Sequence, residues 1–125
     1  MRVLIADDQK DVGVSLAALV AKCGHEVLQV VGSGLEAIQA YTRLKPDIVL
    51  MDYSMPRLNG ATAARMILAK DPAAKIVIVS AAPHTAQLAD TGALTVLPKP
   101  VDLDKLYAVL YDAAPQPTKP PDPTP

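Results

Sequence analysis

The chain has 125 residues, of which 12 are basic and 13 acidic, and its formal charge is −1. Half of the residues are hydrophobic but only 3% are aromatic, which is enough apolar material for the core of one domain built from aliphatic side chains. The balanced charge gives no electrostatic reason to expect nucleic acid or a membrane as a partner, and no apolar run approaches the ~20 residues of a membrane helix.

Short apolar runs alternate with helical patterns along the first half of the chain. We predict strands at residues 3–6, 27–31 and 48–51. Between them, apolar residues at helical spacing predict helices over 12–23 and 34–44. Gly24 is suited to end the first helix, and Ser33 with Glu36 has the spacing of a capping box for the second.

The second half continues the alternation. A helix is predicted from Gly60 to Lys70, a strand over 76–79, a short and marginal helix over 83–90 and a strand over 94–97. Asp102 is suited to cap a last helix. Five apolar strands alternating with helices indicate an α/β fold, with a parallel sheet covered by helices on both faces.

Residues 115–125 differ in composition from the rest of the chain. They hold six of the twelve prolines and no large apolar side chain. We therefore predict one domain over residues 1–114, followed by a disordered or extended proline-rich tail or linker.

Polar side chains stand where four of the predicted strands end. Asp7 and Asp8 follow the first strand, Asp52 the third, Ser80 the fourth and Lys99 the fifth. Ligands of open parallel sheets bind at this edge. Crowded carboxylates need a cation, and an incomplete set of oxygen ligands suits Mg²⁺. A carboxylate can also attack phosphorus, while an ammonium and a hydroxyl neutralise the phosphoryl group.

Each of these residues alone has an ordinary explanation, such as a helix cap or a surface charge. Together they resemble response-regulator receiver domains of two-component systems, and in particular chemotaxis receivers. The matching residues are Asp7-Asp8, Asp52 followed by Met55-Pro56 and Gly60, then Ser80, then Lys99-Pro100. Their order, strand context and spacing agree with the family over residues 1 to about 113.

The resemblance implies a flavodoxin-like, doubly wound sheet of order 2-1-3-4-5. It implies that Asp52 accepts a phosphoryl group from a sensor histidine kinase or a histidine phosphotransfer protein. It further implies that Asp8, Asp52 and the backbone carbonyl of Ser54 ligate Mg²⁺, with Asp7 acting mainly through a bound water. Lys99 would pair with the phosphate and Ser80 would hydrogen-bond it, and the Lys99-Pro100 peptide would be cis. Such a domain is not an enzyme beyond its own phosphorylation and dephosphorylation.

Three features depart from the family pattern. Val96 stands where receivers usually carry an aromatic residue, Pro98 removes an N–H from the fifth strand, and the segment between Ser80 and Lys99 is short. We expect the phosphoryl chemistry to be retained and its coupling to an output to be altered.

Three other functions share parts of this pattern. A pseudo-receiver that binds proteins without phosphorylation would have no reason to keep all five polar residues. A haloacid-dehalogenase-like phosphatase needs a second Asp two residues after the nucleophile, where this chain has Ser54. In a flavodoxin-type cofactor site, Asp7 and Asp8 would repel the phosphate of the cofactor unless a metal intervened.

Charges also interrupt the N-terminal apolar run too early for a signal peptide, so we expect a cytoplasmic protein. Its downstream partner is an unidentified protein, and a homodimer is compatible with such a domain. Tyr107 and Tyr111, four residues apart, are expected at the edge of the core, although Tyr111 could face a partner.

Overall fold

A computed structural model describes residues 1–81 and 91–114. The predicted fold is confirmed: five parallel strands form one sheet in the order β2-β1-β3-β4-β5. The strands are β1 (Arg2–Ala6), β2 (Glu26–Val31), β3 (Ile48–Asp52), β4 (Ile76–Ser80) and β5 (Thr95–Pro98). The helices are α1 (Lys10–Lys22), α2 (Gly34–Leu44), α3 (Gly60–Lys70) and α5 (Leu103–Ala113). The helix predicted over 83–90 and the tail lie outside the described residues.

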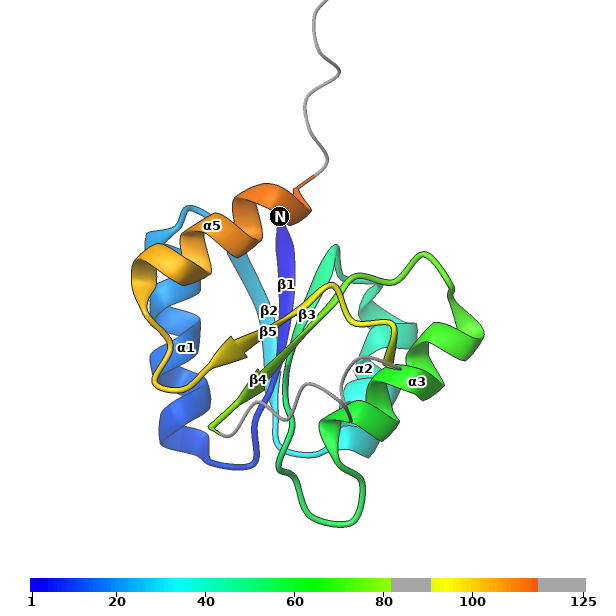
Figure 1. The fold of residues 1–125 in the computed structure, drawn as a ribbon. Helices are drawn as coiled ribbons and strands as arrows, with labels where there is room; N and C mark the ends of the chain where they lie inside the picture. Colours follow the sequence, from blue (N-terminus) through cyan, green and yellow to red (C-terminus); the bar gives the residue numbers. More distant parts are fainter. Residues whose placement is uncertain (82–90, 115–125) are drawn as a thin grey trace, which may run out of the picture.

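Helices cover the sheet on both sides. Figure 1 shows α1 and α5 on one face and α2 and α3 on the other, with β1, β3 and β4 between the two layers. All residues of β3 and β4 are buried, which explains why both strands appear in the sequence as continuous apolar runs. Each face of the sheet has its own aliphatic core, so the strand ends at the sheet edge are held by packing from two sides.

Local signals in the sequence place the helix ends. Gly24 has a positive φ of 87°, and the N–H groups of Gly24 and His25 donate to carbonyls of the last turn of α1, as in a Schellman motif. Ser33 accepts from the Glu36 N–H at 3.1 Å, as predicted. The Glu36 carboxylate, however, accepts from the N–H of Gly32 instead of that of Ser33, one residue earlier than a capping box requires.

The fifth strand is shifted by one residue from its predicted place and ends at Pro98. Among the strands of the described residues it pairs with β4 alone, and it forms one lateral edge of the sheet. A proline is tolerated there because an edge strand has one side on which no ladder hydrogen bond is needed. In the described part of the chain, no helix has the length and apolar character to cross a membrane.

The Tyr41 hydroxyl of α2 donates a hydrogen bond of 2.7 Å to Asp71, the residue that ends α3. Burial and this carboxylate raise the pKa of Tyr41 well above its usual value. A raised pKa of a phenol means that the unfolded state loses its proton first, so its contribution to stability is present below about pH 10 and is lost above it.

We therefore expect Tyr41→Phe to lower the free energy of unfolding by about 1–2 kcal/mol at neutral pH. Between about pH 9.5 and 11.5, its stability should fall less steeply than that of the wild type. Denaturant unfolding at several pH values measures both effects. Tyr107→Phe, at an exposed tyrosine, is the matched control and should behave like the wild type.

Candidate functional site

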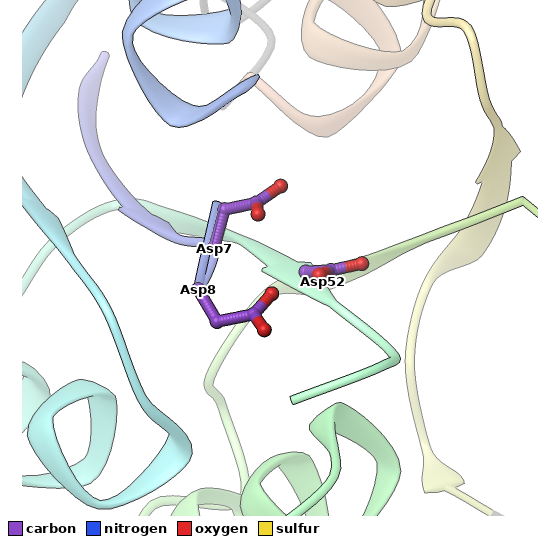
Figure 2. A group of neighbouring side chains, drawn as sticks. All are labelled: Asp7, Asp8 and Asp52. Carbon is purple, nitrogen blue, oxygen red and sulfur yellow. The ribbon is translucent and has the colours of Figure 1, made fainter. Parts of the chain in front are cut away.

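Three aspartates meet at the carboxyl ends of β1 and β3. Each of Asp7, Asp8 and Asp52 offers a carboxylate oxygen, and these oxygens lie within 4.8 Å of one another. Figure 2 shows Asp7 and Asp8 leaving the end of β1 next to Asp52 at the end of β3, with the three carboxylates directed to the same side. The parallel pairing of β1 with β3 produces this arrangement, since Ala6 lies opposite Met51 and the next residues are Asp7 and Asp52.

The three carboxylates differ in exposure. Asp7 and Asp52 are each 3% exposed, whereas Asp8 is exposed to solvent. Burial raises the pKa of Asp52; the neighbouring Asp7 and Asp8 raise it further, and Lys99 acts in the opposite direction. The charged form of Asp52 is therefore less favoured here than in water, and further positive charge at the cluster would stabilise it.

Lys99 brings one positive charge to this cluster from the end of β5. Its Nζ lies 3.0 Å from Asp52 Oδ1 and 3.3 Å from Asp7 Oδ2. Burial by itself would lower the pKa of Lys99, but its hydrogen bonds and attraction to Asp52 and Asp7 outweigh this and leave the pKa raised. The ammonium form is thus held beside Asp52 by two carboxylates.

The backbone around Lys99 is tied to the neighbouring strand. The Lys99 N–H donates to the Ser80 carbonyl at 2.9 Å, and the Lys99-Pro100 peptide is cis. Ser80 is buried at the end of β4, directly after Val79, which is the residue paired with Asp52. Ser54 lies exposed two residues after Asp52. The structure thus places Ser80, Lys99 and Asp52 at the ends of three adjacent strands.

The loop between β3 and α3 is tightly folded. The Leu58 N–H donates to the Pro56 carbonyl at 2.8 Å across Arg57, whose φ is 70°, a γ-turn that is strained for a residue other than glycine. The Gly60 N–H then donates to the Tyr53 carbonyl at 2.8 Å. This turn returns the chain to the carboxyl end of β3, directly beside Asp52.

Two glycines allow a close backbone approach to the site, a role that the sequence pattern did not explain even where it singled out Gly60. A Cβ on Gly60 would overlap the backbone carbonyl of Asp52, and a Cβ on Gly13 of α1 would lie 2.7 Å from Val30 and 3.6 Å from the Cβ of Asp7. Both positions fall in helices, where glycine is intrinsically unfavourable. A glycine within a predicted helix could therefore have been noticed in the sequence, but the sequence does not show which atoms approach it.

The cluster has the chemistry of a magnesium site. Hard carboxylate oxygens suit Mg²⁺, which keeps several of its water ligands when it is bound. The cluster has room for such waters because it is open to solvent at the exposed Asp8. In addition, both oxygens of Asp7 already have partners, since Oδ1 accepts from the Gln9 N–H at 2.9 Å and Oδ2 contacts Lys99. Asp8 and Asp52 are therefore better placed than Asp7 for direct ligation.

Residues 3–111 match the family model described as the response regulator receiver domain. The chain belongs to this family. The receiver is 34% identical over 117 residues to the chemotaxis protein CheY of Listeria monocytogenes, a match that covers 91% of this chain and 98% of the relative. It is 38% identical over 112 residues to CheY of Thermotoga maritima, covering 87% and 93% of the two chains.

Solved structures agree with this assignment. The receiver superimposes on the CheX–CheY–BeF3–Mg²⁺ complex from Borrelia burgdorferi with a TM-score of 0.84 at 26% identity, over 90% of this chain and 87% of that chain. It matches the response regulator TrrA from Thermotoga maritima, in complex with Mg²⁺ and BeF, with the same score and identity, over 90% and 97%.

A mostly apolar hollow of about 590 Å³ borders the site of the receiver. It lies between α1 and the segment that follows β5, and Lys99 forms part of its wall. The apolar part of its lining comes mainly from Val12, Leu16, Leu19, Val79, Pro100 and Val101. An apolar surface therefore lies directly beside the Lys99 ammonium and the aspartate cluster.

The departures from the family pattern are also visible. Val96 is partly buried and packs against the core on the α2–α3 face. None of the chain's four tyrosines falls between Ser80 and Lys99, and the chain has no Phe or Trp. This receiver thus has no Phe, Tyr or Trp in that segment.

Proposed function

We propose that this chain is a phosphoryl-accepting signalling switch of a two-component phosphorelay, with Asp52 as the acceptor. The observation that carries the proposal is the placement of a buried Asp52 carboxylate 3.0 Å from the Lys99 ammonium and next to Asp7 and Asp8. A sensor histidine kinase or a histidine phosphotransfer protein would supply the phosphoryl group. The receiver unit would comprise residues 1–114 and be followed by a tail.

In the transfer, an Asp52 carboxylate oxygen attacks the phosphorus of a phosphohistidine. A P–O bond forms as the P–N bond breaks, and the imidazole leaves with the electron pair of that bond and takes up a proton. Lys99, which already contacts Asp52 Oδ1, pairs with the oxygens of the transferred group. The hydroxyl of Ser80 donates a hydrogen bond to one of them.

Asp8, Asp52 and the backbone carbonyl of Ser54 would hold Mg²⁺ directly, and Asp7 through water. When bound, Mg²⁺ supplies positive charge that offsets the crowded carboxylates and the phosphoryl oxygens. Two similar structures contain Mg²⁺ together with BeF3 or BeF, which supports this cofactor. Asp7 meanwhile orients the Lys99 ammonium through its 3.3 Å contact.

A donor protein would rest on the apolar hollow beside Lys99 while its phosphohistidine reaches Asp52. The chain would then signal by protein contacts to a downstream protein. It would catalyse only its own phosphorylation and dephosphorylation.

The test is incubation with Mg²⁺ and a small phosphodonor, followed by intact-mass measurement. We expect a gain of one phosphoryl group per chain, and no gain when a chelator removes the Mg²⁺. A chain that binds Mg²⁺ but stays unmodified would contradict the proposal and favour a pseudo-receiver, which binds proteins without phosphorylation.

A further inference from the structure

The outer side of α5 carries a stripe of large apolar residues. Leu103, Tyr107 and Tyr111 follow one another at four-residue intervals, which places them on one side of the helix. Their exposed fractions are 39%, 54% and 59%, whereas the side of α5 that faces the sheet buries Leu106 and Leu110 completely. The expectation that the two tyrosines pack at the edge of the core is therefore wrong. We call Leu103, Tyr107 and Tyr111 the tyrosine face.

The two rings of this face are ordered relative to each other. Their centroids are 6.4 Å apart and their planes differ by 18°. Side chains four residues apart on a helix are neighbours, so the pairing itself is ordinary. The result is nevertheless two nearly parallel aromatic rings in solvent, in a chain that has only four aromatic residues. Proline-rich segments are commonly recognised by exposed aromatic side chains that line a binding surface.

A proline-rich segment begins two residues after α5 ends. Residues 115–125 contain prolines at positions 115, 117, 120, 121, 123 and 125, and no glycine. Sequences of this kind favour the polyproline II conformation, in which every third residue lies on the same side, about 9.3 Å apart along the axis. Pro117, Pro120 and Pro123 have this spacing and would therefore form one row of proline rings.

We propose that the proline-rich segment 115–125 packs on the tyrosine face of the same molecule. The reach is sufficient: Tyr107 lies about 9 Å back along α5 from Ala113, and eleven residues in polyproline II conformation span roughly 34 Å. Three or four residues can therefore reverse the chain direction, and the remainder still covers the face. The occupant is the chain's own segment because a short linker gives an effective concentration in the millimolar range. Weak proline–aromatic packing between two molecules cannot compete with this at micromolar concentration.

The segment would cover the apolar stripe and shield it from other proteins. A partner that carries its own proline-rich segment would have to displace it. This role does not depend on phosphorylation of Asp52.

The test uses the full chain labelled with 3-fluorotyrosine, whose four ¹⁹F signals are assigned by single Tyr→Phe changes. In the test variant, Pro120, Pro121 and Pro123 are replaced by Ser. In the matched control, Gln116, Thr118 and Thr124 are replaced by Ser, which keeps every proline. We expect the signals of Tyr107 and Tyr111 to shift and become more solvent-accessible in the proline variant only. The signals of Tyr41 and Tyr53, which lie partly buried at the other face, should not move.

Coincident Tyr107 and Tyr111 signals in the wild type and the proline variant would overturn the proposal. An equal shift in the control variant would also overturn it, because prolines would then not be responsible. Dilution separates packing within one molecule from exchange between two, since only the latter depends on concentration. Wild-type signals that move on dilution would assign the segment to a second copy and contradict packing within the same molecule.

Discussion

Replacing Asp52 by asparagine is expected to abolish phosphoryl incorporation. The amide is almost the same size as the carboxylate, but it is uncharged and is a poor nucleophile towards phosphorus. It also removes one of the three charges that would hold Mg²⁺. The intact mass after incubation with Mg²⁺ and a small phosphodonor should stay at that of the unmodified chain.

The fold should survive this change and become somewhat more stable. Burial and the neighbouring Asp7 and Asp8 raise the pKa of Asp52, so a neutral side chain relieves repulsion, although it also weakens the contact with Lys99. A denaturant unfolding curve checks that the loss of labelling is not a loss of structure.

The matched control is Asp47→Asn. Asp47 is exposed and lies just before β3, at the amino ends of the strands and away from the site. There it accepts a hydrogen bond of 2.7 Å from the Arg2 N–H. An asparagine can keep that bond, and labelling should be unchanged. Continued labelling of the Asp52→Asn variant would show that another group, with exposed Asp8 the first to test, is the acceptor.

Much of this fold could be predicted because its signals are local. β3 and β4 are buried on both faces, so each stands in the sequence as an unbroken apolar run next to polar residues. The predicted bounds of α3 agree with the structure, since Asn59 accepts from the Thr62 N–H and caps that helix. Strand ends and helix caps depend on residues that are close in the sequence. The residues at the carboxyl ends of the strands could therefore be named from the sequence.

Contacts between distant residues could not be predicted in this way. The 3.3 Å contact of Lys99 with Asp7 joins residues 92 positions apart, and the Tyr41–Asp71 bond joins two helices. The exposure of Tyr107 depends on how α5 is rotated against the sheet, which its own periodicity left open because tyrosine is suited both to a core edge and to solvent. Such features depend on how elements pack, whereas the sequence pattern describes one element at a time.

Replacing Gly60 by alanine is expected to damage both the fold and the site. Gly60 is the first residue of α3, and an added Cβ would overlap the carbonyl oxygen of Asp52 and lie 3.0 Å from the Met51 Cγ. A backbone carbonyl cannot rotate away as a side chain can, so the N-terminal end of α3 or the end of β3 must move. We expect the free energy of unfolding to fall by about 1–3 kcal/mol. This loss would occur although alanine is usually the better helix residue by up to about 1 kcal/mol.

The effect on phosphorylation should exceed the effect on folding. Any displacement of the Asp52 carbonyl moves its carboxylate relative to Lys99, which now lies 3.0 Å away. A misplacement of about 1 Å at a reacting group can lower a rate by roughly 100-fold. We therefore expect the rate of labelling by a small phosphodonor to fall by about 10- to 100-fold at saturating Mg²⁺.

Gly32→Ala separates the clash from a general intolerance of alanine. Gly32 lies at the same edge of the sheet, after β2, but an added Cβ would meet only the Glu36 carboxylate at 3.7 Å, an ordinary contact. Its N–H, which bonds to that carboxylate, is kept. This variant should label at the wild-type rate. If Gly60→Ala also did so, the Asp52 carboxylate would be held by β3 and Lys99 alone. An equal loss in both variants would instead mean that the edge as a whole, rather than the close approach of α3 to Asp52, sets the geometry of phosphoryl transfer.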